Sequence, residues 1–192
     1  SRNGELEPIA VIDIGSNSVR LVVYEGLVRS PTTLFNEKVL CGLGRQLAST
    51  GHLGKDAVER ALSALSRFKA ITSLLGVKTL CAIATAACRD ASDGPEFIAK
   101  GERVLGVRIQ VLSGEREAEL AASGILMGFR NPDGIAGDLG GGSLELIDVR
   151  ADKLREAVTL PLGGLRLIDQ AGDRMDRALD YADQQIGSVG WL

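Results

Sequence analysis

Residues 13–22 read DIGSNSVRLV, and residues 138–147 read DLGGGSLELI. Each stretch follows an apolar run, begins with an aspartate, passes through small residues and enters a second apolar run. This pattern predicts two strands joined by a tight turn, twice in one chain. Glycine and serine in such a turn let an anion approach free backbone N–H groups, and the neighbouring aspartate can hold a hard cation. We therefore expect two related half-sites that face each other across a cleft and bind a phosphate chain.

The composition limits the classes of protein to consider. The chain has 192 residues, of which 45% are hydrophobic, enough for one large domain or two small ones. The formal net charge of −3 argues against a general nucleic-acid or membrane surface, and the 4% aromatic content argues against base-stacking platforms. No apolar run approaches the ~20 residues of a transmembrane helix. An anionic substrate would have to be attracted by individual arginines and metal ions.

Cysteine and histidine supply no zinc site. Cys41, Cys81 and Cys88 lack zinc-like spacing, and we expect Cys81 and Cys88 to be buried thiols in a reducing cytoplasm. His52 is the single histidine and lies in a turn-like stretch, where we expect a solvated residue. One histidine excludes a histidine-cluster metal site and argues against a Ser-His-Asp triad.

Periodicity and turn residues predict an α/β chain with a boundary at residues 131–134, Asn-Pro-Asp-Gly. We expect domains 1–130 and 131–192. The first should contain strands at 9–25 (a hairpin), 32–40, 78–86 and 107–112, with helices at 55–75, from 93 onward and at 113–127. The second should repeat the hairpin and add a strand at 157–160 and a helix at 165–186.

The aspartates, one arginine and several glutamates could carry chemistry. Asp13 and Asp138 hold equivalent places; one such aspartate could simply cap a turn, but the recurrence of the whole pattern favours a functional role. Arg89 follows the strand at 78–86 and could grip phosphate oxygens, or it could be a surface arginine paired with Asp90.

A carboxylate is also needed if water is to attack phosphorus. Glu115, Glu117 and Glu119 lie at the start of a helix, where acidic residues are often only surface charges that suit the helix dipole. Beside a phosphate site, however, such a carboxylate could accept a proton from water. Glu145, two residues past Ser143, could hold that water or a cation.

Five stretches resemble one family in order and spacing, over essentially the whole chain. They are residues 11–18 (VIDIGSNS), 84–89 (ATAACR), 112–118 (LSGEREA), 137–145 (GDLGGGSLE) and 161–167 (PLGGLRL). The chain is identified by them as a member of the exopolyphosphatase/guanosine pentaphosphate phosphohydrolase (Ppx/GppA) family. The resemblance implies an actin-like ATPase fold, with two ribonuclease H-like domains that have mixed central sheets. Because members continue well past this point, it also implies that the second domain is incomplete in this chain.

The resemblance further implies Mg²⁺-dependent hydrolysis of a terminal phosphoanhydride, in inorganic polyphosphate or guanosine pentaphosphate. From the cysteines and the net charge we expect a cytoplasmic enzyme without nucleic-acid or membrane partners. The resemblance allows a homodimer of the full-length parent. It assigns residues to three roles: the catalytic base Glu117 with Glu145 assisting, the metal-site residues Asp13 and Asp138, and the phosphate-binding residues Ser16, Asn17, Arg89, Gly141, Gly142 and Ser143.

Two other functions stay open at this point. One is an ATP-dependent kinase of the same superfold, against which the carboxylate at Glu117 argues because it suits activation of water. The other is a non-catalytic module that binds alarmones or polyphosphate, which would keep the same turns. Phosphate release from polyphosphate and guanosine pentaphosphate separates all three.

Overall fold

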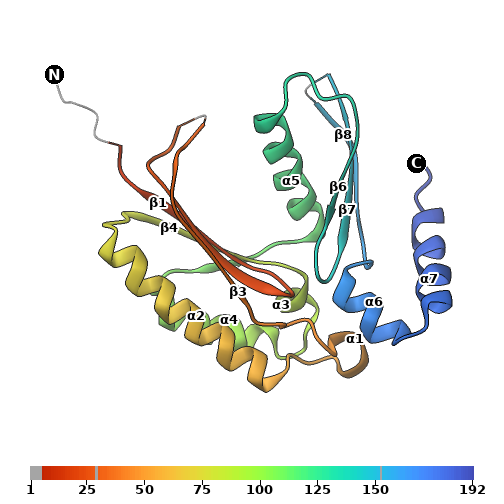
Figure 1. Ribbon diagram of the computed structural model, residues 1–192, viewed down its shortest axis with the longest axis horizontal. Coiled ribbons are helices and arrows are strands. Elements are labelled where there is room, and N and C mark those ends of the chain that lie inside the picture. The colour runs from red at the N-terminus through yellow and green to blue at the C-terminus, as the bar shows by residue number, and fades with distance from the viewer. Residues whose placement is uncertain (1–5, 29, 152) are drawn as a thin grey trace.

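Two sheets and their helices make up the protein (Figure 1). The structure is a computed structural model and describes residues 6–28, 30–151 and 153–192. No helix within these ranges is long and apolar enough to cross a bilayer.

The first sheet has five strands in the order β3-β2-β1-β4-β5. Strands β1 (Ile9–Ile14), β2 (Ser18–Tyr24) and β3 (Thr33–Leu40) form an antiparallel meander, and β4 (Thr79–Ala84) and β5 (Ile109–Val111) continue the sheet in parallel with β1. This mixed order confirms the ribonuclease H-like prediction. It also places the β1–β2 turn beside the C-terminal end of β4, the edge where ligand-binding loops gather in α/β sheets.

Helices α2 (Lys55–Leu74) and α4 (Gly94–Leu105) lie side by side under the first sheet in Figure 1. Apolar residues at helical spacing give α2 one buried face that packs on the strands. The short helices α1 (Leu47–Thr50) and α3 (Ala86–Asp90) lie near the end of the sheet that carries the turn. The core that results is mainly aliphatic, and the aromatic Phe68 is its largest fully buried side chain.

The second sheet repeats the opening of the first. Strands β6 (Gly134–Leu139), β7 (Leu144–Arg150) and β8 (Lys153–Leu160) form an antiparallel meander, as β1, β2 and β3 do. Together the two units confirm the predicted actin-like architecture, and the described residues include three strands of the second unit.

Helix α5 (Gly114–Gly128) packs against the second sheet, although the predicted domain boundary lies after it. Its small residues Ala118 and Ala122 form a buried cluster with Ile147 and Val149 of β7. Helix α5 therefore connects the two sheets physically, and the boundary at 131–134 stays a prediction.

Several predicted elements need correction. Residues 165–186 are not one helix: α6 (Gly164–Ala171) ends at Gly172, whose φ of 58° suits glycine, and α7 (Met175–Gly187) follows. Strand β8 begins at Lys153 instead of 157. The strand predicted at 78–86 ends at Ala84, after which the chain turns into α3, so Arg89 lies on a short helix.

One of the two thiols predicted to be buried is exposed. Cys88 is buried, but Cys81 is not. Side chains alternate along a strand, and Ala82 and Ala84 of β4 face the core, so Cys81 next to Ala82 faces the other way.

We expect Phe68→Ala to lower the free energy of unfolding by about 3–5 kcal/mol, because it leaves a cavity under the sheet. Phe68 is 0% exposed, whereas Leu74 on the same helix is 86% exposed. Leu74→Ala is therefore the matched control and should change stability by less than about 0.5 kcal/mol. Urea denaturation measures both; equal losses in the two variants would contradict this packing.

Candidate functional site

The two repeated turns have the same backbone structure. The Gly15 N–H donates to the Ser18 carbonyl at 2.9 Å, and the Gly140 N–H donates to the Ser143 carbonyl at 2.9 Å. Each turn is also held by the segment that follows the third strand of its meander, a loop in the first unit and the start of α6 in the second. The Gly42 N–H donates to the Asn17 carbonyl at 2.9 Å, and the Leu165 N–H donates to the Gly141 carbonyl at 2.9 Å. The sequence repeat is thus a repeat of a complete hairpin-and-loop unit.

The turns touch each other. A Cβ atom at Gly142 would lie 2.5 Å from the Ser16 Oγ, and one at Gly141 would lie 3.1 Å from the Asn17 backbone nitrogen. These glycines therefore permit a close approach that larger residues would block. The prediction that the two turns face each other is confirmed, and their role in binding phosphate stays a prediction.

A cavity of about 540 Å³ opens between the turns. Nine of the ten predicted site residues line it: Asp13, Ser16, Asn17, Glu117, Asp138, Gly141, Gly142, Ser143 and Glu145. Lys38 of β3 also lines it and was not predicted. The strand register could have revealed Lys38, because Asp13 pairs with Arg20 and Arg20 pairs with Lys38.

Four carboxylates line this cavity, and burial makes the negative charge on three of them energetically unfavourable. Burial raises the pKa of Asp13, and the nearby Asp138 raises it further. Burial also raises the pKa of Glu145 from 4.5 to about 7, with the Ser143 hydroxyl opposing and Glu117 adding to the rise. Burial raises the pKa of Glu117, and the Arg89 guanidinium opposes that rise. The binding of protons or a cation in the cavity is therefore favoured.

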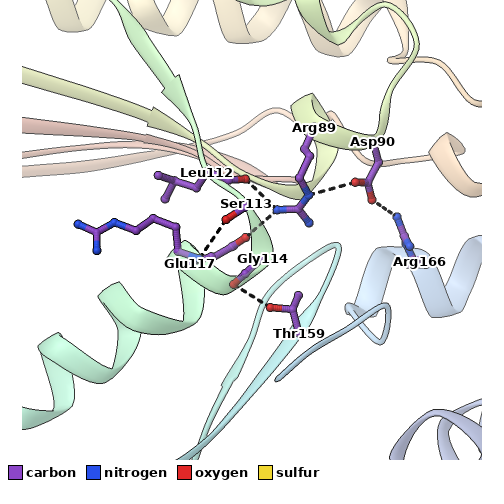
Figure 2. Close-up of polar contacts among 9 residues, drawn as sticks. Arg89, Asp90, Leu112, Ser113, Gly114, Glu117, Thr159 and Arg166 are labelled. Atoms are coloured by element: carbon purple, nitrogen blue, oxygen red, sulfur yellow. Dashed lines mark hydrogen bonds and ion pairs between the residues drawn. The ribbon is translucent and has the colours of Figure 1, made fainter. Parts of the chain in front are cut away.

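Arg89 is the predicted site residue that is not among the described residues lining the cavity. Figure 2 shows its guanidinium between α3 and the start of α5. Nη1 donates to the Leu112 carbonyl at 3.1 Å and to Glu117 Oε2 at 3.2 Å, and Nε donates to Asp90 Oδ1 at 3.2 Å. Arg89 does form the ion pair with Asp90 that the sequence analysis considered for a surface arginine, and it also pairs with Glu117. Direct phosphate binding by Arg89 stays a prediction.

The start of α5 is fixed from both sides, which determines where Glu117 lies. Ser113 accepts a hydrogen bond from the Arg116 N–H at 3.2 Å, as expected of an N-cap residue. The Thr159 hydroxyl of β8 donates to the Gly114 carbonyl at 2.9 Å (Figure 2). Glu119 instead pairs with Arg116 on the surface, so of the three candidate glutamates only Glu117 lines the cavity.

The cavity suits a hydrated divalent cation better than a metal bound by protein alone. In the described part of the chain, no three histidine, cysteine, aspartate or glutamate side chains are grouped closely enough to hold a metal ion. Glu145 Oε1 is buried and has no hydrogen-bond partner among the described residues. Mg²⁺ keeps several waters and usually binds one or two carboxylates plus substrate phosphates. Asp13 and Asp138, one at the end of each hairpin strand, fit that donor set.

Comparison with known proteins gives a consistent result. Residues 22–175 match the model of the Ppx/GppA phosphatase family. Exopolyphosphatase 1 of Mycobacterium leprae is 33% identical over 94% of this chain and 56% of its own length. The crystal structure of an exopolyphosphatase from Cytophaga hutchinsonii is 30% identical over 94% of this chain and 61% of that one, with a TM-score of 0.85. An exopolyphosphatase-like protein of known structure is 27% identical over 95% and 61%, with a TM-score of 0.88. The chain thus spans little more than half the length of these relatives.

We expect Glu145→Gln to stabilise the protein at alkaline pH in the absence of divalent metals. The folded state binds a proton at Glu145 more tightly than the unfolded state, so the free energy of unfolding falls as pH rises from 4.5 to about 7. The variant removes this loss and should be more stable than the wild type by about 1–3 kcal/mol at pH 8, with little difference at pH 4.

Urea denaturation at both pH values in a chelating buffer measures this effect. Glu119→Gln is the control, because Glu119 is exposed and pairs only on the surface. A Glu145→Gln variant that is no more stable than the wild type at pH 8 would show that the Glu145 carboxylate carries no burial penalty.

Proposed function

The chain belongs to the Ppx/GppA phosphatase family, and from this membership and the cavity we propose that it takes part in hydrolysing the terminal phosphoanhydride of inorganic polyphosphate. The named relatives are exopolyphosphatases, which favours polyphosphate as the substrate. Guanosine pentaphosphate ends in the same bond and is the second substrate to test.

The observation that carries the proposal is the meeting of the two turns at one cavity. Each turn offers backbone N–H groups and a serine hydroxyl, the groups that bind phosphate oxygens without adding charge. Two such turns from different sheets can hold neighbouring phosphates of one chain. Phosphoryl transfer depends mainly on this kind of positioning and on neutralisation of charge.

The acidic cavity needs a cation before it can accept a polyanion. We propose that Asp13 and Asp138 hold Mg²⁺, which would neutralise phosphate charge when bound. Lys38 adds a protein cation at the same cavity. Without such charges, the four carboxylates would repel the substrate.

Glu117 is the residue we propose as the base that takes a proton from the attacking water. Arg89 engages Oε2, so Oε1 can accept that proton while the carboxylate stays oriented. Burial raises the pKa of Glu117 toward the range in which a general base works at neutral pH. Glu145, buried on β7 beside Ser143, would orient the same water or the cation.

We expect the protein at its full encoded length to release orthophosphate from polyphosphate when Mg²⁺ is present. Glu117→Gln should reduce the rate about 10²–10⁴-fold while polyphosphate still binds, because the shape is kept and the proton acceptor is lost. Glu115→Gln is the control, since Glu115 lies two residues before Glu117 on the same helix and is not among the residues that line the cavity.

A colorimetric phosphate assay and calorimetric binding measure these two effects. Wild-type activity in Glu117→Gln would remove Glu117 from the mechanism. Binding without phosphate release by the wild type would favour the non-catalytic module, and phosphate transfer from ATP to an acceptor would favour the kinase.

A further inference from the structure

Four side chains of alternating charge form a continuous row beside the cavity (Figure 2). Arg166 Nη2 donates to Asp90 Oδ2 at 2.5 Å, Arg89 Nε donates to Asp90 Oδ1 at 3.2 Å, and Arg89 Nη1 donates to Glu117 Oε2 at 3.2 Å. Asp90 thus uses one oxygen for each arginine. The row ends at the carboxylate proposed as the base.

The row crosses from one half of the molecule to the other. Arg89 and Asp90 lie on α3, at the end of the first sheet, whereas Arg166 lies on α6 after the second sheet, 76 residues from Asp90. The position of α6 therefore determines whether Asp90 has both of its partners.

Helix α6 is in turn attached to the second phosphate-binding turn. The N–H groups of Leu165 and Arg166 donate to the Gly141 carbonyl at 2.9 and 3.3 Å. Gly163 packs so closely on the backbone of Gly141 and Gly142 that a Cβ atom there would clash with it. Arg166 is thus fixed to the turn that would hold phosphate, and any shift of that turn reaches Asp90.

The row is shielded more than an ordinary surface ion pair. The side chains of Arg89, Asp90, Glu117 and Arg166 are between 19% and 31% exposed. Arg174 and Asp176, which also approach to 2.5 Å, are each 60% exposed. Charges screened less by water interact more strongly and hold their geometry better.

We propose that Asp90 and Arg166 are positioning residues that act through Arg89 to orient the Glu117 carboxylate when the second turn is in place. The proposal rests on the hydrolytic function proposed above. Asp90 holds Arg89 from one side while Glu117 and the Leu112 carbonyl hold it from the other. With Arg166 absent, one oxygen of Asp90 loses its partner, and Arg89 can turn away from Glu117.

A second contact of α6 allows the positioning role of Arg166 to be distinguished from a role that only attaches the helix to the first half of the molecule. Asp169, three residues after Arg166, accepts hydrogen bonds from the Ser49 N–H at 3.0 Å and from the Ser49 hydroxyl at 2.8 Å. This contact also joins the two halves of the molecule, but it does not reach the row. Asp169→Ala therefore removes an attachment of α6 while leaving Asp90, Arg89 and Glu117 intact.

The experiment measures kcat and KM for polyphosphate hydrolysis in the full-length protein, alongside melting temperature. We expect Arg166→Gln and Asp90→Asn each to lower kcat about 10–100-fold, with KM changed less than about threefold, because Glu117 is misplaced whereas the two turns, which are held by backbone hydrogen bonds, stay in place. Asp169→Ala should keep the wild-type kcat. Arg174→Gln, which breaks a surface pair of equal length, is the general control.

The exchange variant Asp90→Arg with Arg166→Asp gives the sharpest comparison. It restores an ion pair between α3 and α6 but places a cation next to Arg89, so we expect no recovery of kcat. Recovery would show that the pair only attaches the helix and would overturn the proposal. If Arg166→Gln is unfolded at the assay temperature, Arg166→Lys replaces it. Its kcat should lie between that of the wild type and the value, about 10–100-fold lower, that is expected for Arg166→Gln.

The outcomes also separate this inference from the proposed function. A wild-type protein that releases no phosphate from polyphosphate contradicts the proposed function, and the inference falls with it. An active wild type with unchanged kcat in Arg166→Gln and Asp90→Asn overturns the inference alone. An equal loss of kcat in Asp169→Ala would also overturn it, because attachment of α6 would then explain every effect.

Discussion

The contact between the β1–β2 turn (residues 15–18) and the β6–β7 turn (residues 140–143) is the constraint on which the rest of the structure depends. Gly142 can lie against the Ser16 hydroxyl only because it has no side chain, and Gly163 lets α6 lie against the same turn. The hairpin that carries each turn is held by its own sheet, so the two sheets meet at the turns, whose small residues line one cavity. The cavity between the turns follows from this contact, and one aspartate from each hairpin lines it.

Without a bound cation, the negative charges of the carboxylates that line the cavity are energetically unfavourable. Asp13, Glu117 and Glu145 all have a raised pKa, for which burial is the first cause. The described residues supply no complete metal-binding group, so the remaining ligands of a cation would be water and phosphate. Metal and substrate would then bind together, each making the other's binding more favourable, and Arg89 and Asp90 would keep Glu117 in place during that event.

Both hairpins and the long helix α2 could be predicted from the sequence because their signals are local, and nine of the ten residues predicted for the site line one cavity. An aspartate followed by small residues marks a turn, and apolar spacing marks α2. The contact of Arg166 with Asp90 could not be predicted, because it joins residues 76 positions apart and no local pattern encodes that pairing. The break at Gly172 was missed because the apolar spacing continues beyond it. For Arg89 the sequence left phosphate binding and pairing with Asp90 open. The structure shows the pair with Asp90 and adds one with Glu117, 28 positions away, which no local pattern indicates.

A crystal structure of the protein with tripolyphosphate and Mn²⁺ tests the central claim most directly, because manganese gives an anomalous signal and replaces magnesium at oxygen ligands. We expect a manganese peak between the carboxylates of Asp13 and Asp138, with phosphate oxygens bound to N–H groups of both turns. Phosphate held by one turn alone, or manganese and phosphate bound outside the shared cavity, would contradict the claim that the repeated turns form a single site.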